Sequence, residues 1–326
     1  MKAVIPVAGV GTRMRPHTYS LPKVLLNVAG KPILGHIIDA LIESGIDDIV
    51  IITGYKGELV EEYVLKYYPH LKFEFCKQDE MLGLGHAILQ AKDTFNQEPV
   101  LIILGDTIFD IDLKSAIDSN YNVLAVKAVE DPSRFGVVLV NQNGVIQKLV
   151  EKPKEMISNL AIVGIYSIKD SKLLTQCLEY LVANDIKTRG EYQLTDALQL
   201  MINKGEKFEI CYVDGWFDCG KPETLLSTNE YLLKKNHIPI ELEDSIVIPP
   251  VFISDSAVVT NSIIGPYATI SDGAIITNSI IKHSIISFNA VVKNSLLKKS
   301  IIGSDAEVKG TFTQLNVGDS SQIINK

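Results

Sequence analysis

The chain has 326 residues, 46% of them hydrophobic and 21% charged, and its formal net charge is −8 at pH 7. This size and composition predict a soluble protein of two domains, or of one large and one small domain, and the acidic balance argues against a nucleic-acid binder, which needs a basic face. No apolar run reaches the length of a membrane span and no signal-peptide pattern opens the chain, while four cysteines without C-x-x-C spacing favour a reducing cytoplasm over a zinc or disulfide framework.

Strand and helix patterns alternate along the first 240 residues. Short runs of Val and Ile predict strands, and segments with apolar residues three and four apart predict helices between them. This alternation predicts an α/β domain with a mostly parallel, Rossmann-like sheet, whose ligands bind beyond the carboxyl ends of the strands. The strands are expected at 3–8, 48–53, 72–76, 99–104, 123–129, 136–141, 145–150 and 159–167, and the helices at 33–44, 58–67, 170–181, 193–202 and 223–235.

The first predicted strand ends in a loop with two glycines, Gly9 and Gly11, followed by the cations Arg13 and Lys23. Glycine permits positive φ and a close approach of the backbone to a ligand, so the stretch favours a phosphate cradle of backbone N–H groups and positive side chains. A lone G-x-G is a weak signal on its own. A dinucleotide fingerprint would need a small residue where Met14 stands, and no Walker A pattern is present.

From Gly9 to Lys23 the stretch reads G-x-G-T-R-x-x-P-x-T-x-x-x-P-K. It resembles the signature of the sugar-1-phosphate nucleotidyltransferases, the glucose-1-phosphate thymidylyl- and uridylyltransferases in particular. Pro6 in the preceding strand is common in uridylyltransferases of this family, whereas thymidylyltransferases usually have an aliphatic residue there. The resemblance implies that the nucleotide lies against Ala8, Gly9, Gly11, Thr12 and Arg13.

A second motif, QDEMLGLGHA, begins at Gln78. A side-chain amide offers both a donor and an acceptor, which suits the edge of uracil or thymine. In the family a Gln followed five residues later by Gly holds the pyrimidine, and Gln78 and Gly83 match that spacing. His86 is interpreted as a structural residue at the start of a helix.

Two isolated aspartates are candidate metal ligands. Asp106 follows a continuous apolar strand, where a buried charge is costly unless it is paired, and Mg²⁺ takes carboxylate oxygens together with phosphate oxygens. The resemblance of L-G-D and W-x-D-x-G to family motifs implies that Asp106 and Asp218 hold Mg²⁺. Asp214 is the weaker candidate at the second position. Asp110 and Asp112 are interpreted as turn and helix-cap residues.

Four further motifs resemble the sugar side of the family: R-F-G-V, E-K-P, the strand at 159–167 and G-E-x-x-x-T-D. In the last of these, Tyr192 stands where the family usually has an apolar residue. A charged triplet such as E-K-P is often only a solvated turn, but the match favours a carboxylate that accepts sugar hydroxyls and a lysine that binds the sugar phosphate. The implied sugar-phosphate site consists of Gly136, Glu151, Lys152, Gly164 and Glu191.

From about Val247 the sequence repeats short apolar pairs as N-S-I-I, H-S-I-I, N-S-L-L and K-S-I-I. This hexapeptide pattern predicts a short left-handed parallel β-helix of three to four coils of about eighteen residues each. We therefore expect a nucleotidyltransferase domain at 1–240 and a β-helix domain at 241–326. Asp244 and the tail from Gly318 are expected to cover the ends of the stack. A structural or oligomerising role is favoured over catalysis, because the repeat is short and has one histidine, His283.

Together the motifs predict an enzyme that joins a hexose-1-phosphate, expected to be glucose-1-phosphate, to dTTP or UTP and releases pyrophosphate. The sugar phosphate has a second pKa of about 6, so it is already largely dianionic at neutral pH and needs no protein base. Catalysis then rests on positioning and charge neutralisation. The expected catalytic residues are Arg13, Lys23, Asp106, Lys152 and Asp218, with Mg²⁺ as cofactor.

Two other classes of protein remain open at this point. A non-catalytic regulatory homologue would have the same fold but would have lost the cations and aspartates that this chain retains. A hexapeptide-repeat acyltransferase would rest on the β-helix alone. The expected partners are the two small substrates and further copies of the chain through the β-helix, with no nucleic acid and no membrane.

Overall fold

The described residues of the computed structural model, 1–236 and 238–310, fall into two compact units. The first comprises Met1–Leu26 and Lys31–Thr228, and the second comprises Asn27–Gly30 and the chain from Asn229 onward. The sequence pattern places this division later, between residues 240 and 241.

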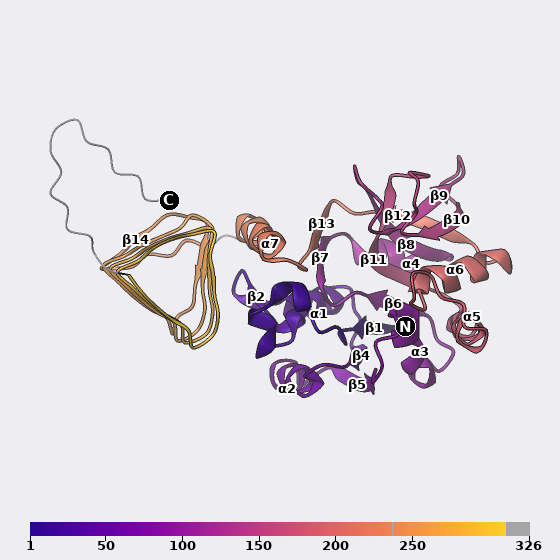
Figure 1. Ribbon diagram of the computed structural model, residues 1–326, viewed down its shortest axis with the longest axis horizontal. Helices are drawn as coiled ribbons and strands as arrows, with labels where there is room; N and C mark the ends of the chain where they lie inside the picture. Colours follow the sequence, from indigo (N-terminus) through magenta and orange to yellow (C-terminus); the bar gives the residue numbers. More distant parts are fainter. Residues whose placement is uncertain (237, 311–326) are drawn as a thin grey trace. The chain divides into compact units, whose positions relative to one another are not determined.

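A nine-stranded sheet forms the centre of the first unit, with the order β10-β9-β11-β6-β1-β4-β5, and β8 and β12 continue from β11 (Figure 1). Strands β6, β1, β4 and β5 are parallel, whereas β11 runs antiparallel to β6 and β8. The Rossmann-like, mostly parallel sheet is confirmed. Its strands are β1 (Lys2–Pro6), β4 (Asp48–Thr53), β5 (Lys72–Lys77), β6 (Val100–Ile103), β8 (Asn122–Ala128), β9 (Gly136–Val140), β10 (Ile146–Glu151), β11 (Leu160–Ile168) and β12 (Phe208–Tyr212).

Helices cover both faces of this sheet, and Figure 1 shows α1 and α2 across β1 and β4 from α3. The central parallel strands β1, β4 and β6 are therefore largely apolar runs with both faces buried, whereas β5, KFEFCK, at the edge of the sheet is partly exposed. The helices are α1 (Ile33–Glu43), α2 (Gly57–Tyr67), α3 (Leu84–Gln90), α4 (Leu113–Asp118), α5 (Ser171–Ala183), α6 (Leu194–Asn203) and α7 (Pro222–Lys235). Short 3₁₀ turns are η1 (Thr12–Met14), η2 (His17–Tyr19), η3 (Lys23–Leu25) and η4 (Lys92–Thr94), and short strands are β2 (Asn27–Val28), β3 (Lys31–Pro32), β7 (Thr107–Asp110) and β13 (Gly215–Asp218).

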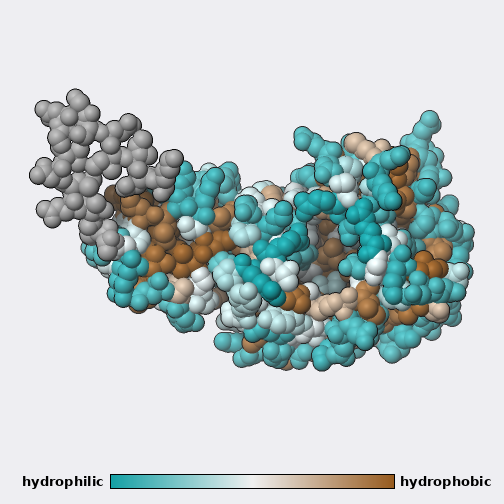
Figure 2. All heavy atoms as spheres, viewed as in Figure 1, coloured by the Kyte–Doolittle hydropathy of each residue, from teal (hydrophilic) through white to brown (hydrophobic). Residues whose placement is uncertain are grey.

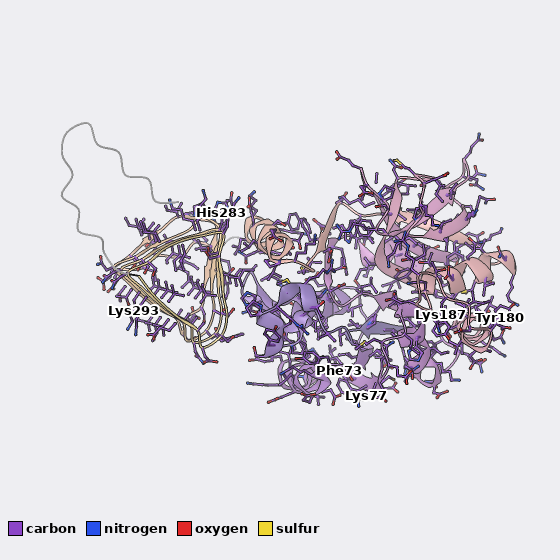
Figure 3. The ribbon with its side chains drawn as sticks, in the orientation of Figure 1. Phe73, Lys77, Tyr180, Lys187, His283 and Lys293 are labelled. Atoms are coloured by element: carbon purple, nitrogen blue, oxygen red, sulfur yellow. The ribbon has the colours of Figure 1, made fainter. Side chains whose placement is uncertain are left out.

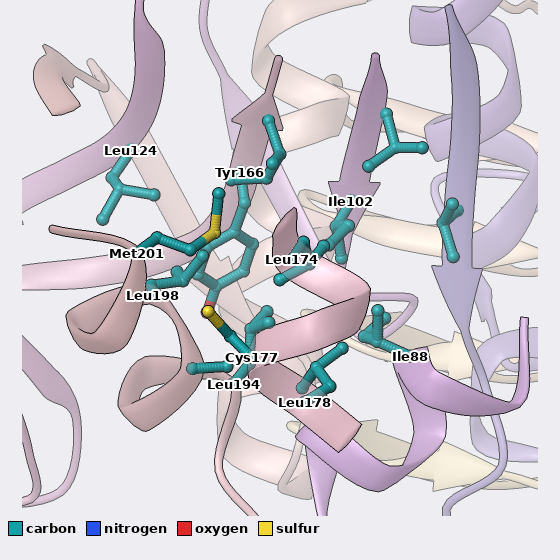
Figure 4. Close-up of a cluster of buried hydrophobic side chains, with 14 of the residues drawn as sticks. Ile88, Ile102, Leu124, Tyr166, Leu174, Cys177, Leu178, Leu194, Leu198 and Met201 are labelled. Atoms are coloured by element: carbon teal, nitrogen blue, oxygen red, sulfur yellow. The ribbon is translucent and has the colours of Figure 1, made fainter. Parts of the chain in front are cut away.

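The main core lies between the sheet and helices α3, α5 and α6 (Figure 4). Leu174, Leu178 and Leu198 are spaced along one face of their helices and are at most 1% exposed. They pack in one cluster with Ile102 and Leu124 of the strands. The helical periodicity seen in the sequence is therefore the face that buries this core.

The interpretation of Asp112 as a helix-cap residue is confirmed. Asp112 is the N-cap of α4, and its carboxylate accepts a hydrogen bond of 3.0 Å from the backbone N–H of Lys114. Asp170 caps α5 in the same way through Leu173, at 2.8 Å. Such caps satisfy N–H groups that the first helical turn leaves without a partner.

The second unit is the left-handed parallel β-helix, built from three parallel four-stranded sheets in the described residues. Ile253 pairs with Ile270 and Ile270 with Ile286, so successive coils have 17 and 16 residues, fewer than the expected eighteen. The strands are β14 (Ile246–Val247), β17 (Ile263–Ile264), β20 (Ile280–Lys282) and β23 (Leu296–Lys298); β15 (Val251–Ile253), β18 (Ala268–Ile270), β21 (Ile285–Ile286) and β24 (Ile301–Ile302); and β16 (Val258–Thr260), β19 (Ile275–Thr277), β22 (Val291–Lys293) and β25 (Glu307–Lys309).

Tight corners explain both the shorter coils and the N-S-I-I repeat. Asn261, Asn278 and Asn294 turn one corner with φ of 48°, 49° and 51°, a left-handed conformation that asparagine tolerates better than most residues. Their amides stack, and Asn261 Nδ2 donates to Asn278 Oδ1 at 2.6 Å. In Figure 3, Lys293 and His283 lie on the outside of the coils. The tail from Gly318, expected to cover one end, lies outside the described residues.

No helix within residues 1–236 and 238–310 combines the length and the apolar character that a membrane crossing requires.

Candidate active site

The glycine loop lies at the carboxyl end of β1, as the sequence predicts for a ligand-binding edge of the sheet. Gly11 has a φ of 67°, and an added Cβ would lie 3.0 Å from Lys23 Cβ and 3.1 Å from Thr18 Cγ2. The Thr18 hydroxyl donates a hydrogen bond of 2.9 Å to the Gly11 carbonyl. Glycine is therefore required here by both the backbone conformation and the close neighbours.

Two adjacent cavities open at this edge, and Figure 2 shows the hollow with hydrophilic residues along its rim. The first, about 440 Å³, is called the nucleotide cavity below, and the second, about 580 Å³, the sugar cavity. Arg13, Leu104 and Asp106 line both, so the two cavities meet at these residues. All predicted nucleotide contacts line the first one: Ala8, Gly9, Gly11, Thr12, Arg13, Gln78 and Gly83.

The amide of Gln78 is held in a fixed orientation at the far end of the nucleotide cavity. Gln78 is 4% exposed, and its Nε2 donates to the Gly83 carbonyl at 3.2 Å and lies 3.0 Å from His86 Nδ1. His86 also contacts Gln90 Nε2 at 3.1 Å. His86 lies in the first turn of α3, which fits its interpretation as a structural residue at a helix start, and its ring contact orients the Gln78 amide.

The residues predicted to handle phosphate and metal converge where the cavities meet. Lys23 Nζ forms an ion pair with Asp106 Oδ2, and the lysine side chain is only 12% exposed. Strand β13 pairs with β7 so that Asp218 lies opposite Thr107, directly after Asp106. Arg13, Asp106 and Asp218 all line the sugar cavity, so the three share one cleft.

Gly220 makes room for two of these side chains. A Cβ at this position would lie 2.7 Å from Arg13 Nη2 and 2.7 Å from Asp218 Oδ1, far inside ordinary contact. The guanidinium and the carboxylate thus occupy the space that a side chain would take. This close approach explains the glycine of the W-x-D-x-G motif.

The carboxylates present suit a hard divalent cation. The described residues contain no group of three or more His, Cys, Asp or Glu side chains able to hold a metal ion. Mg²⁺ is commonly held by one or two carboxylates, with phosphate oxygens and water completing the octahedron. Asp106 and Asp218, beside a cavity of nucleotide size, fit that kind of site.

The E-K-P triplet is fixed by hydrogen bonds from helix α6 and its preceding loop. Thr195 Oγ1 donates to Glu151 Oε2 at 2.7 Å, and Lys152 Nζ lies 3.3 Å from Glu151 Oε1. Lys152 has a left-handed φ of 43°, and its carbonyl accepts a hydrogen bond of 2.7 Å from Arg189 Nη2. A Cβ on Gly136 would lie 3.0 Å from the Glu151 carboxylate, so Gly136 allows this packing.

The predicted sugar residues divide between the two cavities. Lys152 and Gly164 line the sugar cavity, whereas Glu191 lines the nucleotide cavity. Gly136 and Glu151 line neither and lie behind the wall, in contact with Thr195. The roles of these residues stay predictions.

Several residues of the sugar cavity were not singled out from the sequence. Phe135 and Trp216 pack edge to face with ring centroids 4.8 Å apart. Both stand inside recognised motifs, R-F-G-V and W-x-D-x-G, so their neighbours in sequence were the available signal. The additional lining residues include Ser133, Arg134, Phe135, Arg189 and Trp216.

Burial raises the pKa of two groups near the cleft. Burial raises the pKa of the Cys219 thiol to about 12, so it stays protonated and is a poor nucleophile beside Asp218. Burial, and secondarily the charge of Glu151, raises the pKa of the Asp196 carboxyl. Asp196 lines neither cavity, in keeping with a helix-start position.

Comparison with known proteins relates the chain to nucleotidyltransferases. The family model described as nucleotidyl transferase matches residues 2–235. "Bifunctional protein GlmU" of Methanocaldococcus jannaschii is 40% identical over 262 residues, which are 79% of this chain and 61% of that protein. "UTP--glucose-1-phosphate uridylyltransferase AglF" of Haloferax volcanii is 34% identical over 231 residues, 68% of this chain and 93% of that protein. The chain thus spans less than two thirds of the GlmU relative.

Two solved structures share the fold of the first unit. A UDP-glucose pyrophosphorylase complexed with UDP-glucose has a TM-score of 0.63 at 28% identity, covering 72% of this chain and 99% of that one. A putative glucose-1-phosphate thymidylyltransferase from Bacillus anthracis has a TM-score of 0.63 at 30% identity, covering 74% of this chain and 98% of that one. The matched family model, these relatives and the shared cleft lead to one conclusion: the chain belongs to the nucleotidyl transferase family, among its sugar-1-phosphate nucleotidyltransferases.

Proposed function

We propose that the protein transfers a uridylyl or thymidylyl group from UTP or dTTP to glucose-1-phosphate, giving the nucleoside diphosphate sugar and pyrophosphate. One observation carries the proposal: Arg13, Asp106 and Asp218 line one cleft that borders the cavity containing Gln78. The names of a relative and of two solved structures, which mention UTP, UDP-glucose and glucose-1-phosphate, support the choice of substrates.

The reaction exchanges one bond to phosphorus for another. An oxygen of the sugar phosphate attacks the α-phosphorus, a new P–O bond forms, and the bond from the α-phosphorus to the bridging oxygen of the β-phosphate breaks in line. Pyrophosphate leaves with that electron pair. The attacking phosphate is largely dianionic at neutral pH, so no side chain has to remove a proton. The contribution of the protein is orientation and charge compensation.

We assign each of the three cationic side chains to one part of the reacting phosphates. Arg13 lies where the cavities meet and holds the triphosphate and the departing pyrophosphate. Lys152 lines the sugar cavity and Lys23 lines the nucleotide cavity, and together they would hold the attacking phosphate and the α-phosphate. Repulsion between two unit charges 4 Å apart is about 4 kcal/mol at an effective dielectric of about 20, so two polyanions need several cations to approach.

Asp106 and Asp218 would hold Mg²⁺, which when bound supplies further positive charge to the phosphate oxygens. The Lys23–Asp106 ion pair keeps the Asp106 carboxylate compensated in the ligand-free chain. Gln78 would read the pyrimidine through its amide oxygen, an acceptor for the N3–H of the base, because the contacts of Nε2 with Gly83 and His86 fix the orientation of the amide.

The β-helix is proposed to join copies of the chain and not to carry a second reaction. Its coils expose apolar side chains outward, with Leu296 80%, Ile246 61% and Val258 52% exposed. Exposed apolar side chains in such numbers are typical of association surfaces. Light scattering should therefore give a mass above 35.9 kDa, and Leu296→Asp should lower it; a wild-type monomer would refute this role.

The four free cysteines support a reducing, cytoplasmic location.

A substrate matrix tests the function. Pyrophosphate release is measured for UTP, dTTP, ATP and GTP against glucose-1-phosphate, galactose-1-phosphate and N-acetylglucosamine-1-phosphate, with Mg²⁺ and with EDTA. Pyrophosphate release with a pyrimidine nucleotide, glucose-1-phosphate and Mg²⁺ is the expected result. No release with any pair would favour the regulatory homologue, and transfer of an acetyl group from acetyl-CoA instead would favour the acyltransferase.

A further inference from the structure

One loop touches both cavities. The segment Thr188–Gln193, called the bridging loop, is the part of the α5–α6 connection that directly precedes α6. Glu191 lines the nucleotide cavity, and Arg189, two residues earlier, lines the sugar cavity. The loop is a tight turn, because Thr188 and Glu191 exchange backbone hydrogen bonds of 3.0 and 3.3 Å. Movement at one end of so short a turn must move the other end.

The base end of the loop is fixed through main-chain atoms. Tyr192 N donates to the Leu82 carbonyl at 2.8 Å, and Gly85 N donates to the Tyr192 carbonyl at 2.8 Å. Gly83 packs so closely that an added Cβ would lie 2.6 Å from the Tyr192 carbonyl. The same Gly83 accepts the hydrogen bond from Gln78. Any change in the base-binding segment is therefore transmitted directly to Tyr192.

The phosphate end of the loop is fixed through one side chain. Arg189 Nη2 donates to the Lys152 carbonyl at 2.7 Å, and Lys152 has a left-handed φ of 43°. This conformation is costly for a non-glycine residue and needs support from its surroundings. Arg189 supplies such support, and with it the direction in which the Lys152 side chain leaves the backbone.

The loop is anchored from behind by a cluster that touches neither cavity. Tyr192 is 6% exposed, and its hydroxyl donates to Asp185 Oδ1 at 2.7 Å. Lys187, labelled in Figure 3 beyond the end of α5, lies 2.6 Å from Asp185 Oδ1 and 4.8 Å from the centre of the Tyr192 ring. The Tyr192 side chain thus holds the turn without contacting a ligand cavity.

We propose that the bridging loop couples the two substrates, so that a nucleotide bound at Gln78 and Gly83 raises the affinity of the sugar phosphate at Lys152. Tyr192 and Arg189 act as positioning residues in this coupling. The inference rests on the proposed function. Coupling requires that the nucleotide favour one loop position over others, and it is reciprocal, so the sugar phosphate must raise the nucleotide's affinity by the same factor.

Calorimetry measures this coupling without turnover. The dissociation constant of glucose-1-phosphate is determined with Mg²⁺, with and without α,β-methylene-UTP, whose α–β bridge does not break. The ratio of the two constants is the coupling factor, typically about 5 to 150 where sites are coupled. Tyr192→Phe removes one hydrogen bond and should lower the factor about 2- to 10-fold. Tyr180→Phe, on the exposed surface of α5 and outside the loop, is the matched control and should leave it unchanged.

Arg189 gives a second, independent readout. Arg189→Ala should bring the factor close to one, and Arg189→Lys should restore part of it. A merely structural role for Tyr192 would lower thermal stability and both single-ligand affinities while leaving the ratio intact, and that result would overturn the proposal. So would a wild-type factor of one in a protein that releases pyrophosphate. A wild type that releases none in the substrate matrix would instead refute the proposed function itself.

Discussion

Gly220→Ala should damage catalysis without unfolding the protein. The alanine Cβ would lie 2.7 Å from both Arg13 Nη2 and Asp218 Oδ1, whereas ordinary contact begins at 3.4 Å. Gly220 does not have the positive φ that would strain an alanine backbone. The substitution therefore acts on the two functional groups and not on the fold around them.

The size of the effect follows from the displacement. Each of the two groups, or the backbone between them, must give way by about 0.7 Å, the difference between 3.4 and 2.7 Å. Misplacing reacting groups by about 1 Å can cost roughly 100-fold in rate, so turnover is expected to fall roughly 10- to 100-fold. The melting temperature should change little, since the neighbours that move are flexible side-chain ends.

Steady-state pyrophosphate release gives kcat and KM for both substrates. Gly9→Ala is the informative comparison, because Gly9 has no atom within 4 Å of an added Cβ in the ligand-free chain and lines only the nucleotide cavity. That change should raise the nucleotide KM and affect kcat less. Wild-type turnover in Gly220→Ala would contradict the shared role of Arg13 and Asp218.

Three other outcomes are expected. Arg13→Ala and Asp106→Asn should each lower turnover roughly 100-fold or more while circular dichroism stays unchanged, because the first removes a cation that compensates phosphate charge and the second removes an anionic ligand for Mg²⁺; near-normal turnover in either would remove its assigned role. Gln78→Ala should weaken the preference for dTTP or UTP over ATP, and an unchanged ratio of their kcat/KM values would count against base reading. Cys219 should resist iodoacetamide at pH 8 in the native protein, because burial raises the pKa of its thiol from 9.0 to about 12. Rapid labelling of native Cys219, seen in mass spectra, would contradict this expectation. The same pKa shift makes the contribution of Cys219 to folding stability complete below pH 9, and that contribution is lost as the pH rises toward 12.

Much of the fold was predictable, because hydrophobic patterning decides which faces are buried. The strands at 48–53 and 100–103 are runs of Ile, Val and Leu, and the structure buries them on both faces. The length of the β-helix coils was not predicted well. It depends on whether a corner uses a tight left-handed residue such as Asn278, and the repeat pattern alone does not reveal that.

The site was predictable where a residue type is chemically unusual in its position. Asp106 after an apolar strand and the G-x-G-T-R loop both led to residues that line the cleft. Glu191, expected on the sugar side, lines the nucleotide cavity, whereas Arg189, two residues earlier in the same turn, lines the sugar cavity, so the role of Glu191 stays a prediction. The contact of Arg189 with the sugar cavity could not be predicted from the sequence, because its hydrogen bond to the Lys152 carbonyl joins positions 37 residues apart.

The ion pair between Lys23 and Asp106 links the roles of these two residues. The Asp106 side chain, 35% exposed at the end of a buried strand, is partly removed from water, and Lys23 is its ion-pair partner. With Mg²⁺ and a nucleotide bound, Asp106 would hold the cation and Lys23 would contact the phosphates. Removing Lys23 should therefore do more than delete one phosphate contact, because it also leaves Asp106 uncompensated before the substrate binds. A neutral substitute such as Lys23→Met should thus lose both stability and turnover, whereas Lys23→Arg should keep the stability and lose mainly turnover.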